Sequence, residues 1–420
     1  MSALSAWINN DFGDGQISKL FYDGVITEEQ MKIAEQTRKL INKQIGSYED
    51  YKMASTYPDK VKPEIIKRAK NLAALAIQLQ WVEGDASSAE NSFFKINQQA
   101  SPIDKTELLL LKSRKKPNSI AARAIIRSGR GHKYWSGFSN KIQSDIQNLA
   151  KEINQILFDP KLVTPIKTLD IPIGGKIYSA QTLPLVLDFV NLANNYNPKN
   201  KIDLNDDNTG EITVKYLKET RKIAWLLNSQ HPSSLGLHPA VYFYSLDGRY
   251  KIASFFAIVD LVMELKKRNM INKFIDVRSN FEIIIQKYEY IIQQINRKHR
   301  SVQGSYRFIS QFMQLSIELL KKFSIEETID QIINKNEFNY LTKQLASQLS
   351  TTQKDFTTEK KSAIFLKEAL KNTPKCKICN GLIHRNSISI DHIERKRDGG
   401  VADINNAQLT HPYCNSGYKN

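Results

Sequence analysis

Cysteine is scarce in this sequence: only three occur in 420 residues, and all three lie between residues 376 and 414. An odd number of cysteines in one short segment argues against a disulfide framework and indicates a reducing compartment. Long uncharged apolar runs are also missing, because the best candidate, residues 252–265, is interrupted by Asp260. The first residues lack a cationic stretch followed by an apolar core, so we expect no signal peptide. We therefore expect a cytoplasmic protein with no membrane partner.

Acidic residues are outnumbered by basic ones, 43 to 60, which gives a formal net charge of +17 at pH 7. Such an excess favours a polyanionic partner, because each phosphate that a protein neutralises releases counterions. The alternative is a solvated basic surface without a nucleic-acid partner. A basic run from Lys112 to Lys133 ends at Tyr134 and Trp135. This run suits nucleic acid if the rings stack on bases, or a solvated helix face if Trp135 belongs to a core.

Two pairs of metal-ligand residues enclose the C-terminal segment. Cys376 and Cys379 form a Cys-x-x-Cys pair, and His411 and Cys414 repeat the same spacing. Two thiolates at that spacing converge on one point, so the four residues predict one zinc ion in a tetrahedral site. Four protein ligands leave no open position, which indicates structural zinc bound through deprotonated sulfur and neutral imidazole. A zinc-ribbon or treble-clef binding module without catalysis is the alternative interpretation of these four residues.

Polar residues of a second kind lie between and beside the two pairs: Asp391-His392, Asn406 and Asn415. Neighbouring residues of a strand point to opposite faces, so we expect a bend rather than regular pleating to place Asp391 and His392. The order of these residues resembles the HNH nuclease family, whose ββα-metal fold surrounds one catalytic metal ion. The resemblance implies an α+β domain of that type at residues 356–420, anchored by the zinc site.

The resemblance also implies a role for each matching residue. His392 is expected to act as the general base that takes a proton from water, and Asn406 is expected to orient it. Asp391 and Asn415 are expected to be the protein ligands of a catalytic Mg²⁺ or Mn²⁺ ion, which suits their oxygen donors. The implied reaction is hydrolysis of DNA phosphodiester bonds, leaving a 5′-phosphate and a 3′-hydroxyl.

The N-terminal region carries a second resemblance. Residues 92–108 combine Phe93-Phe94, Ile96-Asn97, a proline turn and Glu107-Leu108. This order resembles a segment of ParB-like domains in GmrSD-type restriction and antiphage defence proteins. The nucleotide-linked motif of that family is represented here only by Asp14-Gly15-Gln16, for which a surface turn is the alternative interpretation.

The sequence predicts a predominantly helical α+β chain in three parts. Residues 1–135 are expected to form a partial ParB-like mixed α/β region with a strand at 76–82, and residues 136–350 a helical domain. A polar segment at 344–354 is expected to link it to the HNH domain at 356–420. Apolar residues at helical spacing predict long helices at 142–157 and 281–295. Further helices are expected at 63–75, 180–193, 250–267, 306–323 and 358–371.

Together these features predict a metal-dependent HNH endonuclease that cleaves DNA in bacterial restriction or antiphage defence. Two alternatives stay open from the sequence: a non-catalytic, zinc-containing nucleic-acid-binding subunit, and an RNase toxin. A protein partner or a homo-oligomer that activates the nuclease is compatible with each of the three.

Overall fold

The computed structural model describes residues 3–21, 24, 26, 28–74, 105–131, 134–177, 179, 181–198, 204–343 and 355–419. The chain divides into two compact units. The smaller unit comprises Met1–Lys112 with Arg130–Lys133, and the larger comprises Ser113–Gly129 with Tyr134–Asn420. The expected three-part division, with boundaries near residues 135 and 350, stays a prediction.

Several sequence-based expectations lie outside the described residues. These are the strand at 76–82, nearly all of the segment at 92–108 and the polar linker at 344–354. The proposed ParB-like resemblance of the N-terminal region therefore stays a prediction.

Within its described residues, the smaller unit consists of helices joined by turns. Trp7 anchors it, because its indole Nε1 donates to the carbonyl of Gly46 at 2.8 Å and its ring packs edge-on against Tyr48 and Tyr51. In the turn Asp14-Gly15-Gln16, Asp14 forms an ion pair with Arg38. The helices are α1 (Ala3–Ile8), α2 (Gln16–Phe21), α3 (Glu28–Gln44), α4 (Tyr48–Thr56), α5 (Pro63–Ala73) and α7 (Lys105–Lys112).

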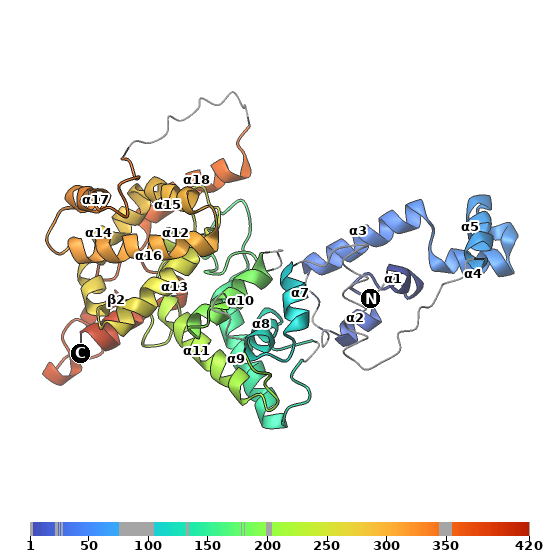
Figure 1. Ribbon diagram of the computed structural model, residues 1–420, viewed down its shortest axis with the longest axis horizontal. Coiled ribbons are helices and arrows are strands. Elements are labelled where there is room, and N and C mark those ends of the chain that lie inside the picture. The colour runs from blue at the N-terminus through green and yellow to red at the C-terminus, as the bar shows by residue number, and fades with distance from the viewer. Residues whose placement is uncertain are drawn as a thin grey trace. The chain divides into compact units, whose positions relative to one another are not determined.

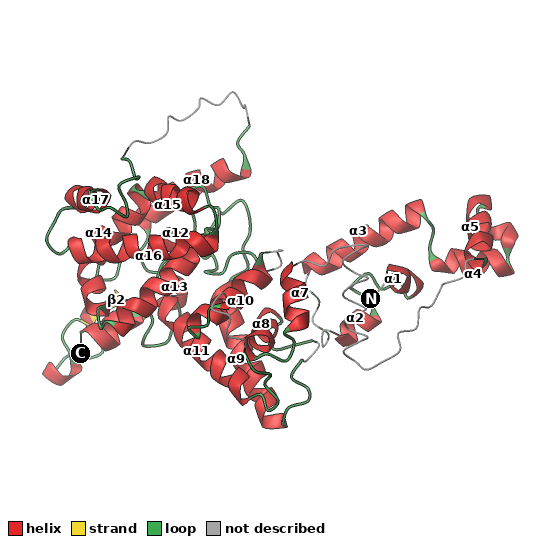
Figure 2. Ribbon diagram, viewed as in Figure 1, coloured by secondary structure: helices red, strands yellow, loops and turns green. Residues whose placement is uncertain are grey.

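The larger unit is built from packed helices (Figures 1 and 2), and aromatic side chains such as Phe189, Phe255 and Phe281 are buried in its core. Its helices are α8 (Pro117–Ile126), α9 (Asn140–Phe158), α10 (Thr182–Ala193), α11 (Glu211–Leu227), α12 (Pro239–Tyr242), α13 (Ile252–Lys267), α14 (Ile271–Lys287), α15 (Glu289–His299), α16 (Val302–Leu319), α17 (Ile325–Ile333) and α18 (Thr358–Ala369). Helix α13 packs on α16, α9 on α11, and α14 contacts α12, α13 and α16. Trp135 is fully buried, so it belongs to this core, and Arg123 and Arg127 stack on Tyr134.

Most of the helices predicted from apolar spacing are confirmed within a few residues of their expected bounds. One expectation is wrong: residues 281–295 do not form a single helix, because α14 ends at Lys287 and α15 begins at Glu289. Tyr288 breaks the run with φ −110° and ψ 28°, and its ring is buried. The spacing of apolar residues cannot detect this break, because the helical periodicity continues in phase on both sides of Tyr288. Among the described residues, no helix is long and apolar enough to cross a membrane.

The C-terminal segment adds the only two-stranded sheet found in the described part of the chain. Strand β1 (Ser389–His392) pairs antiparallel with β2 (Ala407–Thr410), and Asp391 lies opposite Gln408. The expected bend at Asp391-His392 is therefore wrong, because both residues occupy regular ladder positions. A short π-helical turn, η7 (Cys414–Tyr418), contacts β1 and α14. A mainly helical chain that ends in a small hairpin with a zinc-type cluster confirms the predicted fold class.

Candidate metal centre and nuclease site

The four predicted zinc ligands form one buried cluster. One ligand atom from each of Cys376, Cys379, His411 and Cys414 lies within 4.8 Å of all the others. His411 Nδ1 is 3.3 Å from the sulfur of Cys379 and 3.9 Å from that of Cys414. Three sulfurs and one ring nitrogen converging on a closed site are the donor set of structural zinc.

Backbone hydrogen bonds shape the turn that carries the first two cysteines. The amide of Cys376 donates to the carbonyl of Gly381, and the amide of Asn380 donates to the carbonyl of Cys376, both at 2.9 Å. Asn380 adopts φ 55°, which reverses the chain directly after Cys379. The amide of Lys377 donates to the carbonyl of Leu409 and so joins this turn to β2. The turn is thereby held against the strand that leads to His411.

His411 is oriented for metal binding by its second ring nitrogen. Nε2 donates to the carbonyl of Leu382 at 3.1 Å, which leaves Nδ1 as the acceptor facing the sulfurs. Burial lowers the pKa of His411, and the nearby charge of Arg278 lowers it further, so the ring is neutral at pH 7. A neutral imidazole with one nitrogen aimed at the cluster is the form that binds zinc.

The three thiols are close enough to share their protons. Contact with Cys379 lowers the pKa of Cys376, whereas contact with Cys376 raises the pKa of Cys414. Ionisation of the three sulfurs is therefore interdependent while protons are their only partners. A divalent cation replaces those protons and allows all three sulfurs to ionise together, so the residues present fit a zinc ion.

The hairpin holds the predicted catalytic residues on and beside β1. Asp391 is buried, and its Oδ2 accepts from Gln408 Nε2 at 2.8 Å and from Lys419 Nζ at 2.7 Å. Lys419 also donates to the carbonyl of His392. Its ammonium group thus provides a positive charge at the carboxylate that we expected to bind a metal ion.

Asn415 lies in η7 and is attached to the same strand. Its Nδ2 donates to Ser389 Oγ at 2.8 Å and to the carbonyl of Ile390 at 3.3 Å. Ser389 and Asp391 share one face of β1, because side chains alternate along a strand. The structure therefore brings Asn415 and Asp391 to the same face of the hairpin.

His392 is half-buried at the end of β1, on the alternate face. It lines a cavity of about 220 Å³ together with Asp391 and Asn406, and Asn415 is not part of that lining. Asn406 Oδ1 accepts from the amide of Glu394 at 2.7 Å, and its Nδ2 donates to the carbonyls of Glu394 and Val401. Asn406 thus closes the loop that follows His392, and its described bonds reach the backbone rather than the imidazole.

The hairpin and η7 are fastened to the helical part of the same unit. Tyr413 donates its hydroxyl to Asn272 at 2.8 Å, and Tyr418 donates its hydroxyl to Asp276 at 2.7 Å. Both acceptors lie one turn apart on α14. Ser416 Oγ donates to the carbonyl of Pro232 at 2.8 Å. The turn that carries Asn415 is therefore held between the strand and α14.

Sequence reasoning missed several residues of this site. Gln408 and Lys419 contact Asp391, while Arg278 and Glu282 lie beside the zinc cluster. No spacing rule marks the first two, because they meet Asp391 only when the hairpin and η7 fold. Arg278 and Glu282 have the i,i+4 spacing of an ordinary exposed helix pair, which gave no sign that both are buried.

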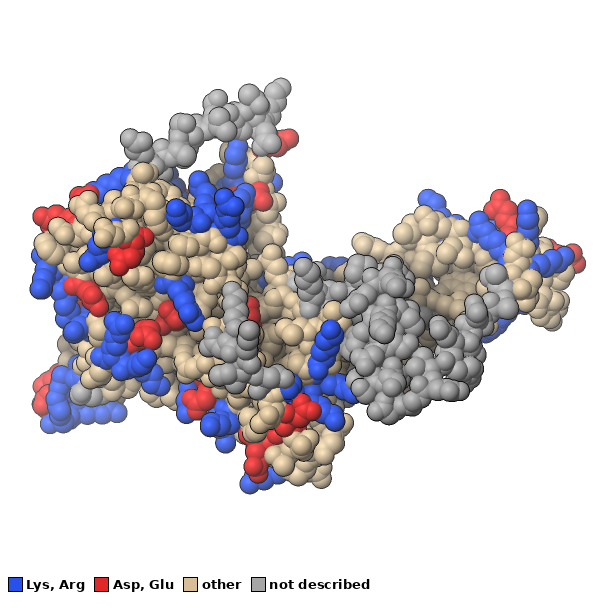
Figure 3. All heavy atoms as spheres, viewed as in Figure 1, with Lys and Arg blue, Asp and Glu red and all other residues tan. Residues whose placement is uncertain are grey.

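Basic side chains surround the tip of the hairpin. Arg395, Lys396 and Arg397 follow β1, and the two last of these are exposed. Figure 3 shows Lys and Arg atoms gathered at the lower left, where Figure 1 draws the C-terminal segment. Arg395 also donates to the carbonyl of Lys419 at 2.8 Å. A positive surface next to a buried carboxylate and a half-buried imidazole suits an anionic substrate.

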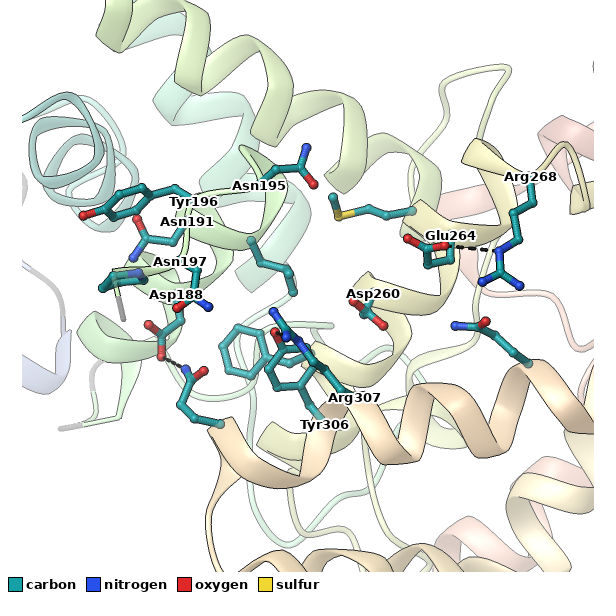
Figure 4. Close-up of a pocket in the computed structure, with 16 residues that line it drawn as sticks. Asp188, Asn191, Asn195, Tyr196, Asn197, Asp260, Glu264, Arg268, Tyr306 and Arg307 are labelled. Carbon is teal, nitrogen blue, oxygen red and sulfur yellow. Dashed lines mark hydrogen bonds and ion pairs between the residues drawn. The ribbon is translucent and has the colours of Figure 1, made fainter. Parts of the chain in front are cut away.

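A larger cavity lies elsewhere in the helical unit. It measures about 570 Å³, lies between α10, α13 and α16, and has a polar lining (Figure 4). Burial raises the pKa of Asp188 and of Asp260 in its wall. None of its lining residues belongs to the zinc cluster or the hairpin. Cavity size therefore does not identify the candidate nuclease site, which the motif residues define instead.

A two-stranded hairpin, a short helical turn packed on it and a buried Cys₃His cluster at its base define a zinc-anchored ββα-metal domain. Comparison with protein families agrees: the family model described as HNH endonuclease matches residues 376–420. This segment is therefore an HNH domain, as the resemblance of its motifs predicted. No curated protein and no solved structure matches the chain.

Proposed function

We propose that residues 376–420 act as a metal-dependent endonuclease that hydrolyses phosphodiester bonds in DNA. The observation that carries this proposal is the joining of Asn415 to the strand of Asp391 and His392 through the 2.8 Å bond to Ser389. It supports Asp391 and Asn415 as ligands of one metal ion, because Ser389 and Asp391 share a face of β1 in a segment that the HNH family model matches.

The proposed roles rest on the match of these residues to the HNH motif and on their common neighbourhood at β1. His392, half-buried at the edge of the 220 Å³ cavity, accepts a proton from the attacking water. Asp391 and Asn415 would hold a Mg²⁺ or Mn²⁺ ion through their side-chain oxygens. That ion, when bound, neutralises charge on the phosphate and on the leaving oxygen. Asn406 closes the loop after His392 and so holds the backbone next to the imidazole in one conformation.

DNA is the proposed substrate because the cavity lies beside exposed cations on a chain with net charge +17. The biological role that we propose is bacterial restriction or antiphage defence, which rests on the N-terminal resemblance. The zinc thiolates require a reducing environment, which supports a cytoplasmic location.

The test is cleavage of supercoiled plasmid by the purified full-length protein with Mg²⁺ or Mn²⁺. We expect nicked and linear products, their loss in EDTA, and their loss in His392→Ala. The matched control is His231→Ala, because His231 is a half-buried histidine that stacks on Trp225 of the helical unit. Cleavage should persist in that variant.

Three results would overturn the proposal. Full activity of a folded His392→Ala protein would rule out His392 as the general base. Cleavage of an RNA of matched length with intact plasmid would favour the RNase alternative. Plasmid binding without cleavage under any metal condition would favour the non-catalytic binding subunit.

A further inference from the structure

Arg278 is a fully buried arginine whose guanidinium group reaches the zinc cluster from helix α14. Its Nη1 is 3.2 Å from Nδ1 of the zinc ligand His411. Nη1 also donates to the carbonyl of Leu235, and Nη2 donates to the carbonyl of Gly236 at 2.9 Å. A charged group with no access to water is costly to bury unless several partners compensate it. The position of Arg278 therefore indicates a specific electrostatic role.

The zinc cluster provides the reason for a positive charge at this place. A zinc ion of charge +2 with three thiolates and a neutral imidazole carries a net charge of −1. The guanidinium of Arg278 lies within a few ångströms of the sulfurs, because its Nη1 is 3.2 Å from His411 Nδ1, which is itself 3.3 Å from the sulfur of Cys379. A cation at this distance favours ionised sulfur, because an opposite charge nearby stabilises the charged form.

Glu282 connects this arginine to the rest of the metal site. Its Oε1 accepts from Arg278 Nε at 2.8 Å and from the Tyr242 hydroxyl at 3.0 Å. Its Oε2 accepts from the amide of Leu382 at 3.1 Å, and the carbonyl of Leu382 accepts from His411. A zinc-bound Nδ1 has no lone pair left to accept from Arg278, so the arginine supports His411 through Glu282 and the Leu382 carbonyl that accepts from Nε2.

The Cys-x-x-Cys turn is shaped to admit the guanidinium. A Cβ at Gly381 would lie 2.3 Å from Arg278 Nε, so a side chain at that position would displace the arginine. The absence of a side chain at Gly381 therefore lets the turn with the first two zinc ligands pack directly against Arg278 of helix α14.

We propose that Arg278 is a positioning residue of the zinc site, which holds the Leu382 acceptor of His411 through Glu282 and supplies the counter-charge for the zinc-bound thiolates. Zinc retention is then set partly by Arg278 of helix α14, which lies more than 90 residues before Cys376 in the sequence. This role is independent of whether the hairpin cleaves DNA, so it survives failure of the proposed nuclease function.

The experiment measures zinc release from the full-length protein into a chromophoric chelator. We expect Arg278→Met to release zinc about 10–100-fold faster than the unmodified protein, the usual effect of removing a group that supports a metal ligand. Arg278→Lys keeps the charge but loses the fork of donors, so we expect an intermediate rate. The matched control is Arg221→Met, because Arg221 forms a 3.0 Å ion pair with Glu152 between α11 and α9. Its zinc release should equal that of the unmodified protein.

A second comparison separates this role from simple pairing with Glu282. In Arg278→Met with Glu282→Gln, neither charge of the buried pair is left, so any penalty for an unpaired carboxylate disappears. We expect the double variant to regain thermal stability but still to release zinc quickly. In the cobalt-substituted protein, we expect Arg278→Lys to shift the thiolate-to-cobalt absorption band, which probes the sulfur environment directly.

Two outcomes would overturn the proposal. One is zinc release from Arg278→Met at the rate of Arg221→Met. The other is restoration of slow release by the double substitution, which would show that Arg278 serves only to neutralise Glu282. If Arg278→Met does not fold, Arg278→Lys decides: unchanged release and an unchanged cobalt spectrum would refute the role.

Discussion

Gly236 offers a sharp test of the contact between the helical unit and the zinc site. It adopts φ +59°, in the left-handed region, and a Cβ there would lie 2.4 Å from Cδ2 of His411. The same Cβ would lie 2.8 Å from Ser387 Oγ. We therefore predict that Gly236→Ala strains the backbone and pushes against a zinc ligand at the same time.

The magnitude has two parts. A non-glycine residue in the left-handed conformation costs roughly 1–2 kcal/mol. Forcing an extra methyl group into a packed site costs typically about 1–3 kcal/mol, because neighbours must leave their preferred positions. We expect Gly236→Ala to lower the free energy of unfolding of the larger unit by about 2–5 kcal/mol, the sum of these two costs. Zinc should also dissociate faster, because the atom displaced belongs to the ligand ring.

The assay is urea unfolding of the full-length protein together with chelator-driven zinc release. Gly399→Ala is the matched control, since Gly399 has φ +101° and its added Cβ would meet nothing within 4 Å among the described residues. That variant should carry the backbone cost alone and release zinc normally. Equal unfolding free energies and equal zinc release for the two variants would refute the proposed contact with His411.

Three further predictions concern the C-terminal segment. His392→Ala should reduce cleavage by about 10²–10⁴-fold, the usual share of a general base, with unchanged zinc content; cleavage near the original rate would contradict its role. Cys376→Ser should lose zinc and expose the C-terminal segment to trypsin, because metal binding there supplies folding energy; normal metal content and protease resistance would argue against it. In the absence of DNA, Lys419→Met should bind Mn²⁺ about fivefold more tightly. The ammonium of Lys419 competes with the metal ion for the Asp391 carboxylate, and removing that ion pair is worth roughly 1 kcal/mol. Unchanged or weaker Mn²⁺ binding, measured by electron paramagnetic resonance, would disprove the competition.

Much of the C-terminal site could be predicted from the order of residues along the chain. The spacing of Cys376, Cys379, His411 and Cys414 predicted one zinc cluster, and the four side chains do converge. Such ligand sets can be recognised in a sequence, because a metal ion needs particular donor atoms at short range and tight turns bring those donor residues together. The HNH resemblance followed from the same segment for the same reason.

The local conformation of the site was less predictable. Asp391 and His392 were expected at a bend, yet they lie in a regular strand, because pairing with β2 holds both residues in the ladder. Likewise, the helix expected at 281–295 breaks at Tyr288, where burial of the ring outweighs helical continuity. In both places, contacts with distant residues decided the backbone, and periodicity does not register such contacts.

The spacing of the metal ligands and the periodicity of apolar residues were sufficient to predict a mainly helical chain with a zinc-anchored HNH domain at its C-terminal end. The surroundings of that end depend on folding: Lys419, which follows η7, meets Asp391 on β1, and Arg278 reaches His411 from helix α14. These pairs are 28 and 133 residues apart in the sequence. A charge acts through space over a few ångströms, so only the packed structure could reveal which charges surround the metal ligands.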